Sequence, residues 1–192
     1  MARAGLTTDK VAQAGAELAD ELGFEHVTIS ELARRLGVRV ASLYSHVDGS
    51  DDLRTRIALV ALEEMARRGD EAVAGRSGRD ALIALAGVYR GYATEHPGRY
   101  DAARLRLAPE VAATSAGPRL SRMLRDAVRG YDLAEPEQTH AVRLVGSLFH
   151  GYISLEGSGG FAHSEPDSAT SWASILDALD AMLRSLPAPT RA

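Results

Sequence analysis

The sequence predicts an all-α protein with two helical domains. Every strong hydrophobic period along its 192 residues has the spacing of a helix, and no run of alternating apolar and polar residues is long enough for a strand. Helix breakers, among them Gly23, Gly37 and His96-Pro97-Gly98, fall between the periodic stretches rather than inside them. We expect a three-helix domain over residues 1–49 and a larger helical domain over residues 50–192.

A first helix is expected to begin near residue 8 and to end at Leu22-Gly23-Phe24. Its apolar positions recur at helical spacing and therefore share one face, which carries Val11, Ala14, Gly15, Leu18 and Leu22. Gly15 lowers the helix propensity at that point, but it would also let a neighbouring helix approach closely.

A pair of short helices joined by a glycine turn follows. Thr28 with Glu31 three positions later is a capping box, which satisfies orphan backbone amides at the start of a helix. Gly37 ends this helix because glycine accepts a positive φ at that position. The second helix is expected from Arg39 to His46. This is the arrangement of a helix-turn-helix, whose second helix fits the major groove of DNA.

The same region resembles the N-terminal domain of the TetR family of transcriptional repressors. The resemblance covers residues 8–54 and runs through Thr28-Ile29, Leu32-Ala33, Leu36-Gly37-Val38, Leu43-Tyr44-x-His46-Val47 and Leu53. Two positions depart from the family pattern. Gly15 stands where the family usually has alanine, and Ser50, followed by Asp51 and Asp52, stands where it usually has a lysine that meets a DNA phosphate.

The expected DNA contacts lie on and beside the second short helix. On its outer face Val40 and Ala41 offer apolar contact to thymine methyl groups, and Arg39 and Ser42 offer hydrogen bonds to bases or phosphates. The family resemblance implies that Thr28, Tyr44 and His46 hold phosphates. The predicted partner is double-stranded operator DNA, contacted by Thr28, Arg39, Val40, Ala41, Ser42, Tyr44, Ser45 and His46.

The charge balance excludes a broad basic surface. The net charge is −4, and the first 50 residues hold five Lys and Arg against seven Asp and Glu. Any positive footprint must therefore be local, built from Arg34, Arg35 and Arg39, with Arg3 on an N-terminal arm. The chain has no cysteine, which excludes disulfides and thiolate metal sites, and no histidine pair has metal-ligand spacing. No metal or cofactor is expected.

Membrane and enzyme functions are also disfavoured. The uncharged run Leu144–Leu155 is too short to span a bilayer, and no signal peptide is visible. We therefore expect a cytoplasmic protein with no membrane partner. Gly157-Ser-Gly-Gly160 lacks the lysine of a phosphate-binding loop, and no nucleophile elbow is present.

The middle of the chain alternates helices with irregular stretches. A fourth helix is expected from about Ser50, a loop over residues 66–80 and a fifth helix over residues 79–95. A short helical piece is expected after Tyr100, and residues 108–118 look irregular and mobile. A further helix carries the apolar stripe Leu120, Met123, Leu124, Ala127, Val128 and Tyr131.

The last two helices, over residues 136–156 and 168–186, each have more than one buriable face. Since most oligomers of identical chains are symmetric dimers, we expect a two-fold four-helix interface. Its predicted residues are Leu144, Leu148, Gly151, Leu155, Ser174, Ala178, Ala181 and Ser185. This half of the chain resembles a TetR-family ligand-binding domain with a His-Gly motif, through His96-Pro97-Gly98, Phe149-His150-Gly151-x-x-x-Leu155-Glu156 and Gly160-Phe161.

Aromatic and methionine side chains gather within residues 79–131 and 136–156, where they could line an apolar cavity or simply form the core. The predicted ligand-binding residues are Tyr89, Tyr92, Tyr100, Met123, Phe149, His150 and Tyr152. We expect an uncharged or weakly acidic, largely apolar effector, with residues 108–118 as its entry. Glu156 lies near a helix C-terminus, where negative charge is disfavoured. It needs a partner such as His163, an arginine or a ligand, unless that helix end is solvated.

These features predict a homodimeric, ligand-responsive transcriptional repressor that binds a pseudo-palindromic operator and is released by a small effector. The alternative is an all-α protein of the same fold that binds small molecules or lipids and no specific operator. Ser50 and the acidic balance of the N-terminal region favour that alternative. DNA titration distinguishes the two.

Overall fold

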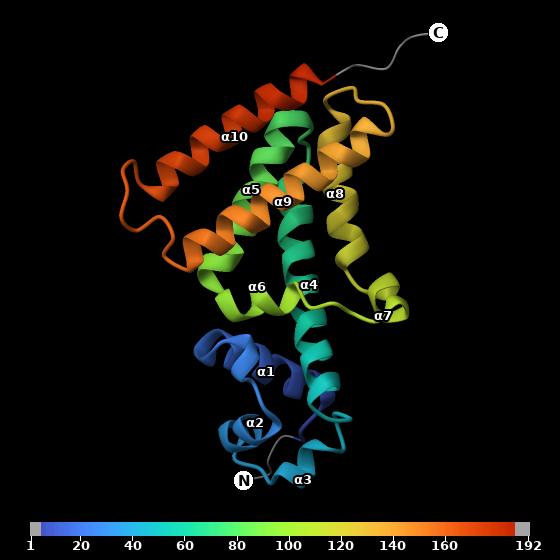
Figure 1. Cartoon of the computed structure of the whole chain (residues 1–192). Coiled ribbons are helices and arrows are strands. Elements are labelled where there is room, and N and C mark those ends of the chain that lie inside the picture. The colour runs from blue at the N-terminus through green and yellow to red at the C-terminus, as the bar shows by residue number, and fades with distance from the viewer. Residues whose placement is uncertain (1–4, 187–192) are drawn as a thin grey trace. The chain divides into compact units, whose positions relative to one another are not determined.

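The computed structural model describes residues 5–186, a span built of helices joined by turns (Figure 1). Over those residues it contains ten α-helices, one short 3-10 helix and no strand. The all-α prediction is confirmed.

The chain divides into two compact bodies. Among the described residues, the first comprises 5–64 and 92–117, and the second comprises 65–91 and 118–186. Two helices, α4 (Ser50–Val73) and α5 (Gly78–Glu95), contribute to both bodies. The predicted division into residues 1–49 and 50–192 stays a prediction.

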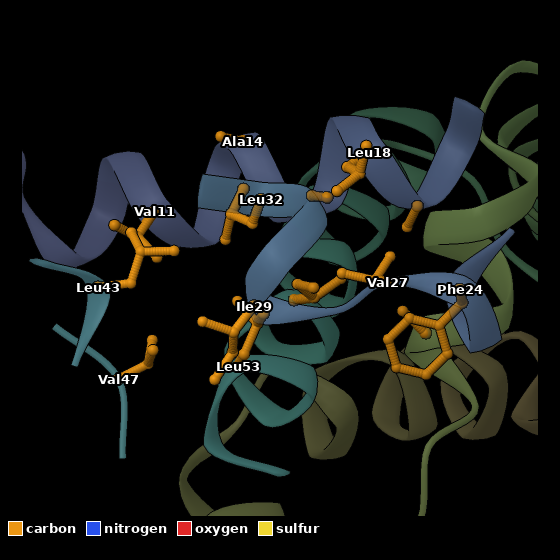
Figure 2. Close-up of a cluster of buried hydrophobic side chains, with 14 of the residues drawn as sticks. Val11, Ala14, Leu18, Phe24, Val27, Ile29, Leu32, Leu43, Val47 and Leu53 are labelled. Atoms are coloured by element: carbon orange, nitrogen blue, oxygen red, sulfur yellow. The ribbon is translucent and has the colours of Figure 1, made fainter. Parts of the chain in front are cut away.

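The first body combines the three N-terminal helices with segments from later in the chain. Besides the start of α4 and the end of α5, it contains α1 (Thr8–Leu22), the 3-10 helix η1 (Phe24–His26), α2 (Ile29–Leu36), α3 (Val40–Leu43), α6 (Pro97–Ala103) and α7 (Pro109–Thr114). Figure 2 shows its core, where apolar side chains of α1, α2, α3 and α4 meet. Val11, Leu32, Leu43 and Leu53 are completely buried there.

Two glycines set how closely helices approach α1 in this body. A Cβ built on Gly15 would lie 2.9 Å from Ile57 Cδ1, so α4 packs closely against this glycine, as the sequence predicts. A Cβ built on Gly98 would lie 1.9 Å from the carbonyl oxygen of Ala19. No other residue fits at position 98 without moving backbone, so α6 rests directly on the main chain of α1.

The second body contains the end of α4, most of α5, α8 (Gly117–Arg129), α9 (Glu137–Gly157) and α10 (Ser168–Ser185). Its interior is apolar and includes Leu82, Leu85, Val145, Phe149, Leu179 and Leu183. A Cβ built on Gly130 would lie 2.4 Å from the Cα of Gly78, so the end of α8 meets the start of α5 backbone to backbone.

Three predicted boundaries are wrong. Residues 66–73 continue α4 rather than forming a loop, because Gly69 is buried there, with its Cβ position 2.7 Å from Met123 Sδ. The stretch 108–118 holds α7 and the start of α8, because Pro109 occupies a first-turn position instead of breaking a helix. The second short helix extends only from Val40 to Leu43. Beyond it the chain turns, with the His46 amide donating to the carbonyl of Leu43 at 2.8 Å.

Within residues 5–186, none of the helices combines the length and the apolar character that crossing a bilayer requires.

Candidate nucleic-acid interface

The α2–Gly37–α3 segment is held by local hydrogen bonds and one buried side chain. The hydroxyl of Thr28 accepts a hydrogen bond from the Glu31 amide at 3.1 Å, which caps α2 as predicted. Gly37 adopts a left-handed conformation with φ of 62°, and its amide donates to the carbonyls of Ala33 and Arg34 in the last turn of α2. Leu43 is completely buried, so its side chain fixes one side of α3 against the core. The opposite side of α3 is therefore left facing outward.

That outward side carries most of the predicted DNA contacts. Thr28, Arg39, Val40, Ala41, Ser42, Tyr44 and Ser45 are exposed, and His46 is half-buried. Over residues 5–186 only five large apolar residues are exposed, and two of them, Val40 at 39% and Tyr44 at 56%, lie at α3. The structure thus places these residues on and beside α3, and their contacts with DNA stay a prediction.

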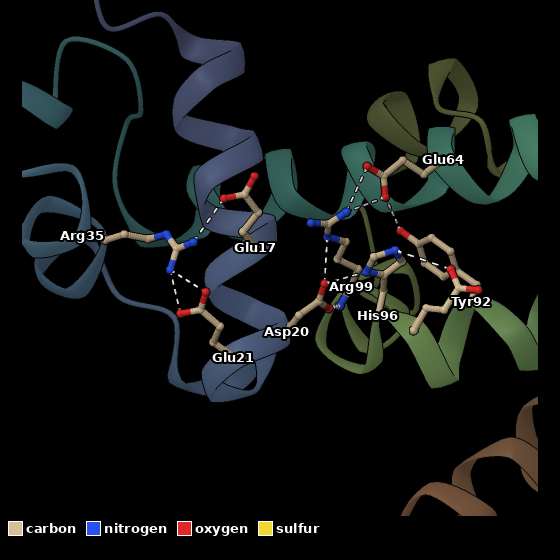
Figure 3. Close-up of polar contacts among 9 residues, drawn as sticks. Glu17, Asp20, Glu21, Arg35, Glu64, Tyr92, His96 and Arg99 are labelled. Carbon is tan, nitrogen blue, oxygen red and sulfur yellow. Dashed lines mark hydrogen bonds and ion pairs between the residues drawn. The ribbon is translucent and has the colours of Figure 1, made fainter. Parts of the chain in front are cut away.

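The arginines near α3 are less available than the sequence suggested. Arg35 Nη1 donates to Glu21 Oε2 at 2.6 Å, and Arg35 Nη2 donates to Glu17 Oε2 at 3.2 Å (Figure 3). These hydrogen bonds, with Glu21 the stronger partner, raise the pKa of Arg35 and tie α2 to α1. Arg34 donates to Glu31 through Nε at 3.0 Å. Within residues 5–186 no carboxylate pairs with Arg39, and Arg3 lies outside the residues that the structure describes.

The start of α4 carries the departure from the family pattern. Ser50 is the exposed first residue of this helix. Asp52 accepts a hydrogen bond from the Asp48 amide at 2.9 Å and another from Arg56 Nε at 2.8 Å. Partial burial opposes ionisation of Asp52, but these two hydrogen bonds outweigh it and lower its pKa. Asp52 therefore helps to build the turn into α4.

A buried polar cluster joins α1, α4, α5 and α6 within the first body (Figure 3). The Asp20 carboxylate accepts a hydrogen bond from the Arg99 amide at 2.9 Å and lies 3.0 Å from both Arg99 Nε and His96 Nδ1. Arg99 Nη1 donates to Glu64 at 3.1 Å, and the Tyr92 hydroxyl donates to the same carboxylate at 2.7 Å. Burial and the contact with Glu64 raise the pKa of Tyr92. Arg99 thus holds carboxylates of two helices at once.

This cluster was not predicted. The motif His96-Pro97-Gly98 marked the segment, but Arg99 finds its partners 79 and 35 residues away in the chain, at Asp20 and Glu64. Local spacing carries no signal for such pairs.

The predicted ligand-binding residues fall in both bodies. Tyr92 and Tyr100 belong to the first, whereas Tyr89, Met123, Phe149, His150 and Tyr152 belong to the second. In the second body the ring of Tyr89 lies 5.5 Å from those of both Phe149 and His150, measured between centroids. Burial raises the pKa of Tyr89 to about 12. All seven are buried except His150, which is half-buried, and their contact with a ligand stays a prediction.

The partner of Glu156 is Arg90. Nε and Nη2 of Arg90 donate to the two oxygens of this carboxylate at 2.9 and 2.6 Å, a fork that fits a carboxylate. The hydrogen bonds to Arg90 lower the pKa of Glu156.

Beside this pair, a recess of about 370 Å³ opens on the connection between α9 and α10, lined in part by Phe161, Glu165 and Asp167. None of the predicted ligand-binding residues lines this recess.

The predicted dimer residues lie on an uncovered face of the second body. On α10, Ser174, Ala178, Ala181 and Ser185 are all exposed, beside Met182. On α9, Gly151 and Leu155 are exposed and Leu144 and Leu148 are half-buried.

Among residues 5–186, no group of three or more acidic or histidine side chains is arranged to hold a metal ion.

Both parts of the chain match family models. Residues 11–54 match the family described as "Bacterial regulatory proteins, tetR family", and residues 82–179 match "Tetracyclin repressor-like, C-terminal domain". The HTH-type transcriptional regulator YobS of Bacillus subtilis is 31% identical over 166 residues, which cover 85% of each chain. A second HTH-type transcriptional regulator, from Mycobacterium tuberculosis, is 32% identical over 160 residues, which cover 81% of this chain and 72% of that protein.

Solved structures share the fold. Mycobacterium smegmatis BioQ is similar with a TM-score of 0.71 at 20% identity, covering 94% of this chain and 99% of BioQ. A TetR variant from Acinetobacter baumannii in complex with minocycline is similar with a TM-score of 0.67 at 22% identity, covering 95% of this chain and 100% of that chain.

Proposed function

Because the chain belongs to the TetR family of bacterial transcriptional regulators, we propose that it is a homodimeric repressor that leaves its operator when a small molecule binds. Membership of that family makes it a DNA-binding regulator and not an enzyme. In the proposed complex, two copies of α3 enter major grooves of a pseudo-palindromic operator. Its half-sites lie one helical turn, roughly 34–36 Å, or a multiple of it apart. The protein would act in the cytoplasm, on the chromosome.

The outward face of α3 is the observation that carries this proposal. Leu43 anchors the helix in the core, so its exposed side has a defined orientation. Arg39 supplies a guanidinium for bases or phosphates, and Tyr44 supplies a hydroxyl on a well-exposed ring. Arg39 stands at the N-terminal end of α3 and Tyr44 directly follows its last residue, and a helix with such side chains on its outer face suits the major groove.

Dimerisation is supported by the uncovered face of α9 and α10. Leu155 is 54% exposed and Met182 45%, beside small residues that would let a partner helix approach closely. In sedimentation experiments at micromolar concentration we expect a dimer for the wild type and monomers for Ala178→Arg. Ala173→Arg adds the same charge on the side of α10 that carries Asp177 and should stay dimeric. A monomeric wild type, or a normal dimer of Ala178→Arg, would contradict this interface.

The effector is proposed to be a small, largely apolar molecule bound within the second body. The support is the aromatic group around Tyr89, together with the structural likeness to a TetR variant solved with minocycline. Preferential binding of the effector to a conformation that does not fit DNA would shift the population off the operator. A thermal-shift screen followed by operator release tests this. Tightest binding of a highly polar ligand, unaffected by Phe149→Ala and His150→Ala, would contradict it.

Selection from a randomised duplex pool tests the repressor function itself. We expect an inverted repeat to be enriched, and both Arg39→Ala and Tyr44→Ala to weaken binding to it. Leu22→Ala truncates an apolar side chain of similar exposure on α1, 42%, and should bind as the wild type does. Failure to enrich any inverted repeat at low salt would overturn the proposal.

The alternative, a protein of this fold that binds small molecules or lipids without an operator, keeps one specific support. Ser50 and its acidic neighbours occupy the exposed start of α4, where the family usually places a phosphate-binding lysine. Equal affinity for every duplex sequence would favour this alternative.

A further inference from the structure

We propose that operator recognition by this protein depends on the 5-methyl group of a thymine in each half-site, read by Val40. The inference rests on the proposed function and adds the identity of a base that α3 recognises. It follows from which side chains around α3 remain available to DNA.

Three of the polar side chains on and beside this surface already have partners within the protein. Arg35 is held by Glu17 and Glu21 of α1, and the Arg34 guanidinium is held by Glu31. The hydroxyl of Ser45 donates its proton to the Ser42 carbonyl at 2.8 Å, so it has no donor left for a base. Arg39, Ser42 and Tyr44 stay available for hydrogen bonds, and apolar contact adds a second means of telling bases apart.

Val40 is the side chain best placed to make that contact. It is the first residue of α3, and the N-terminal end of such a helix is the part that contacts bases in the major groove. Although Val40 is apolar, it is 39% exposed. A β-branched side chain has one strongly preferred rotamer, so little side-chain freedom is lost when it meets a base. Its neighbour Ala41 is also exposed but offers only one methyl group.

The chemistry of the groove then selects the base. Among the four bases, thymine alone presents a methyl group at the floor of the major groove, whereas cytosine, adenine and guanine present donors and acceptors. Val40 can satisfy no donor or acceptor, so placing it against those groups would strip them of water without compensation. Methyl-to-methyl contact is the arrangement that its side chain stabilises.

The test replaces each thymine of the selected operator in turn by deoxyuridine, which removes the methyl group and keeps every hydrogen-bonding group. At one position per half-site we expect wild-type affinity to fall about fourfold, the value of burying one methyl-sized group. Substitution in both half-sites should lower affinity about fifteenfold, since separate contacts add. Titrations at low salt keep weakened variants measurable, because phosphate contacts then dominate.

Variants assign the effect to Val40. Val40→Ala should bind thymine and uracil operators with equal affinity, and Val40→Thr, which keeps the shape but replaces a methyl by a hydroxyl, should show a reduced preference. Leu22→Ala should keep the full preference for thymine.

Three outcomes would overturn the inference. Uracil could be tolerated at every position, Val40→Ala could keep the wild-type preference, or no thymine could occur in the selected half-sites. Each of these leaves operator selection, and with it the proposed function, intact. Failure to select any operator would instead overturn the proposed function.

Discussion

The guanidinium of Arg99 on α6 lies 3.0 Å from the carboxylate of Asp20 on α1, and both side chains are largely buried. Glu64 of α4 completes the arrangement at 3.1 Å from Arg99 Nη1. Taking these charges out of water is costly unless each finds a partner. The pair therefore fixes α6 against α1, the helix to which Arg35 ties α2.

Asp20→Ala should be strongly destabilising, because it leaves the buried guanidinium of Arg99 facing Glu64 alone. We expect a loss of about 2–3 kcal/mol in the free energy of unfolding, the value of lost hydrogen bonds to a charged group, measured by urea denaturation followed by circular dichroism. Asp101→Ala removes an exposed partner of Arg104 on the same helix and should change little. Equal effects of the two substitutions would contradict the role given to Asp20.

Gly98→Ala should lower the melting temperature sharply, because the added methyl meets the Ala19 carbonyl, which is backbone and cannot turn aside. Gly15→Ala is the matched control. There the added methyl meets side-chain atoms of Ile57 and Leu53, which can shift more easily than backbone, and alanine favours a helix by about 1 kcal/mol over glycine. We expect Gly15→Ala to lower the melting temperature much less than Gly98→Ala, because side chains can repack and the gain in helix propensity offsets part of the cost. A tolerated Gly98→Ala would show that α6 does not rest on the backbone of α1.

Ser50→Lys should strengthen binding to the selected operator by supplying the phosphate contact that this chain lacks. Each added phosphate contact steepens the dependence of log K on log salt by about 0.9, so a dimer should gain about twice that. Ser164→Lys adds the same charge on the connection between α9 and α10 and should leave the salt slope unchanged. An unchanged slope for Ser50→Lys would place the start of α4 away from the DNA backbone.

The Arg90–Glu156 pair should make stability depend on pH in the acid range. Hydrogen bonds to Arg90 lower the pKa of Glu156 in the folded protein. Its contribution is therefore complete above the unfolded pKa of about 4.3 and is lost as the pH falls through the folded value. Urea denaturation from pH 7 to pH 3 should show that the free energy of unfolding of Glu156→Gln falls less with acidification than that of the wild type. Arg90→Gln should show the same reduced fall. Parallel curves for all three proteins would mean that the pair contributes nothing.

The helices that the sequence predicted well are those whose ends are marked locally. The Thr28 cap and the left-handed Gly37 bound α2 within the chain itself, and such signals need no distant partner. The end of α4 was predicted wrongly because Gly69, read by itself, is typical of a loop. In the structure Met123 packs against it and the helix continues. Nothing near position 69 in the sequence indicates that contact.

The interface and the polar cluster show the same difference. The exposed face of α3 could be predicted because a helix with one buried anchor, Leu43, has a determined outer side. The availability of its arginines could not, because the carboxylates that hold Arg35 come from α1, 14 and 18 residues earlier. Charge counts list such groups but do not say which of them meet.

The central claim is that α3 reads a specific DNA sequence, and the ratio of two affinities tests it most directly. Fluorescence anisotropy should be measured with the selected inverted repeat and with a scrambled duplex of the same composition, both at physiological salt. A specific operator should be bound at least about a thousandfold more tightly than the scrambled duplex, and Tyr44→Ala should weaken binding to both. Equal affinities of the wild-type protein for the two duplexes would contradict the account.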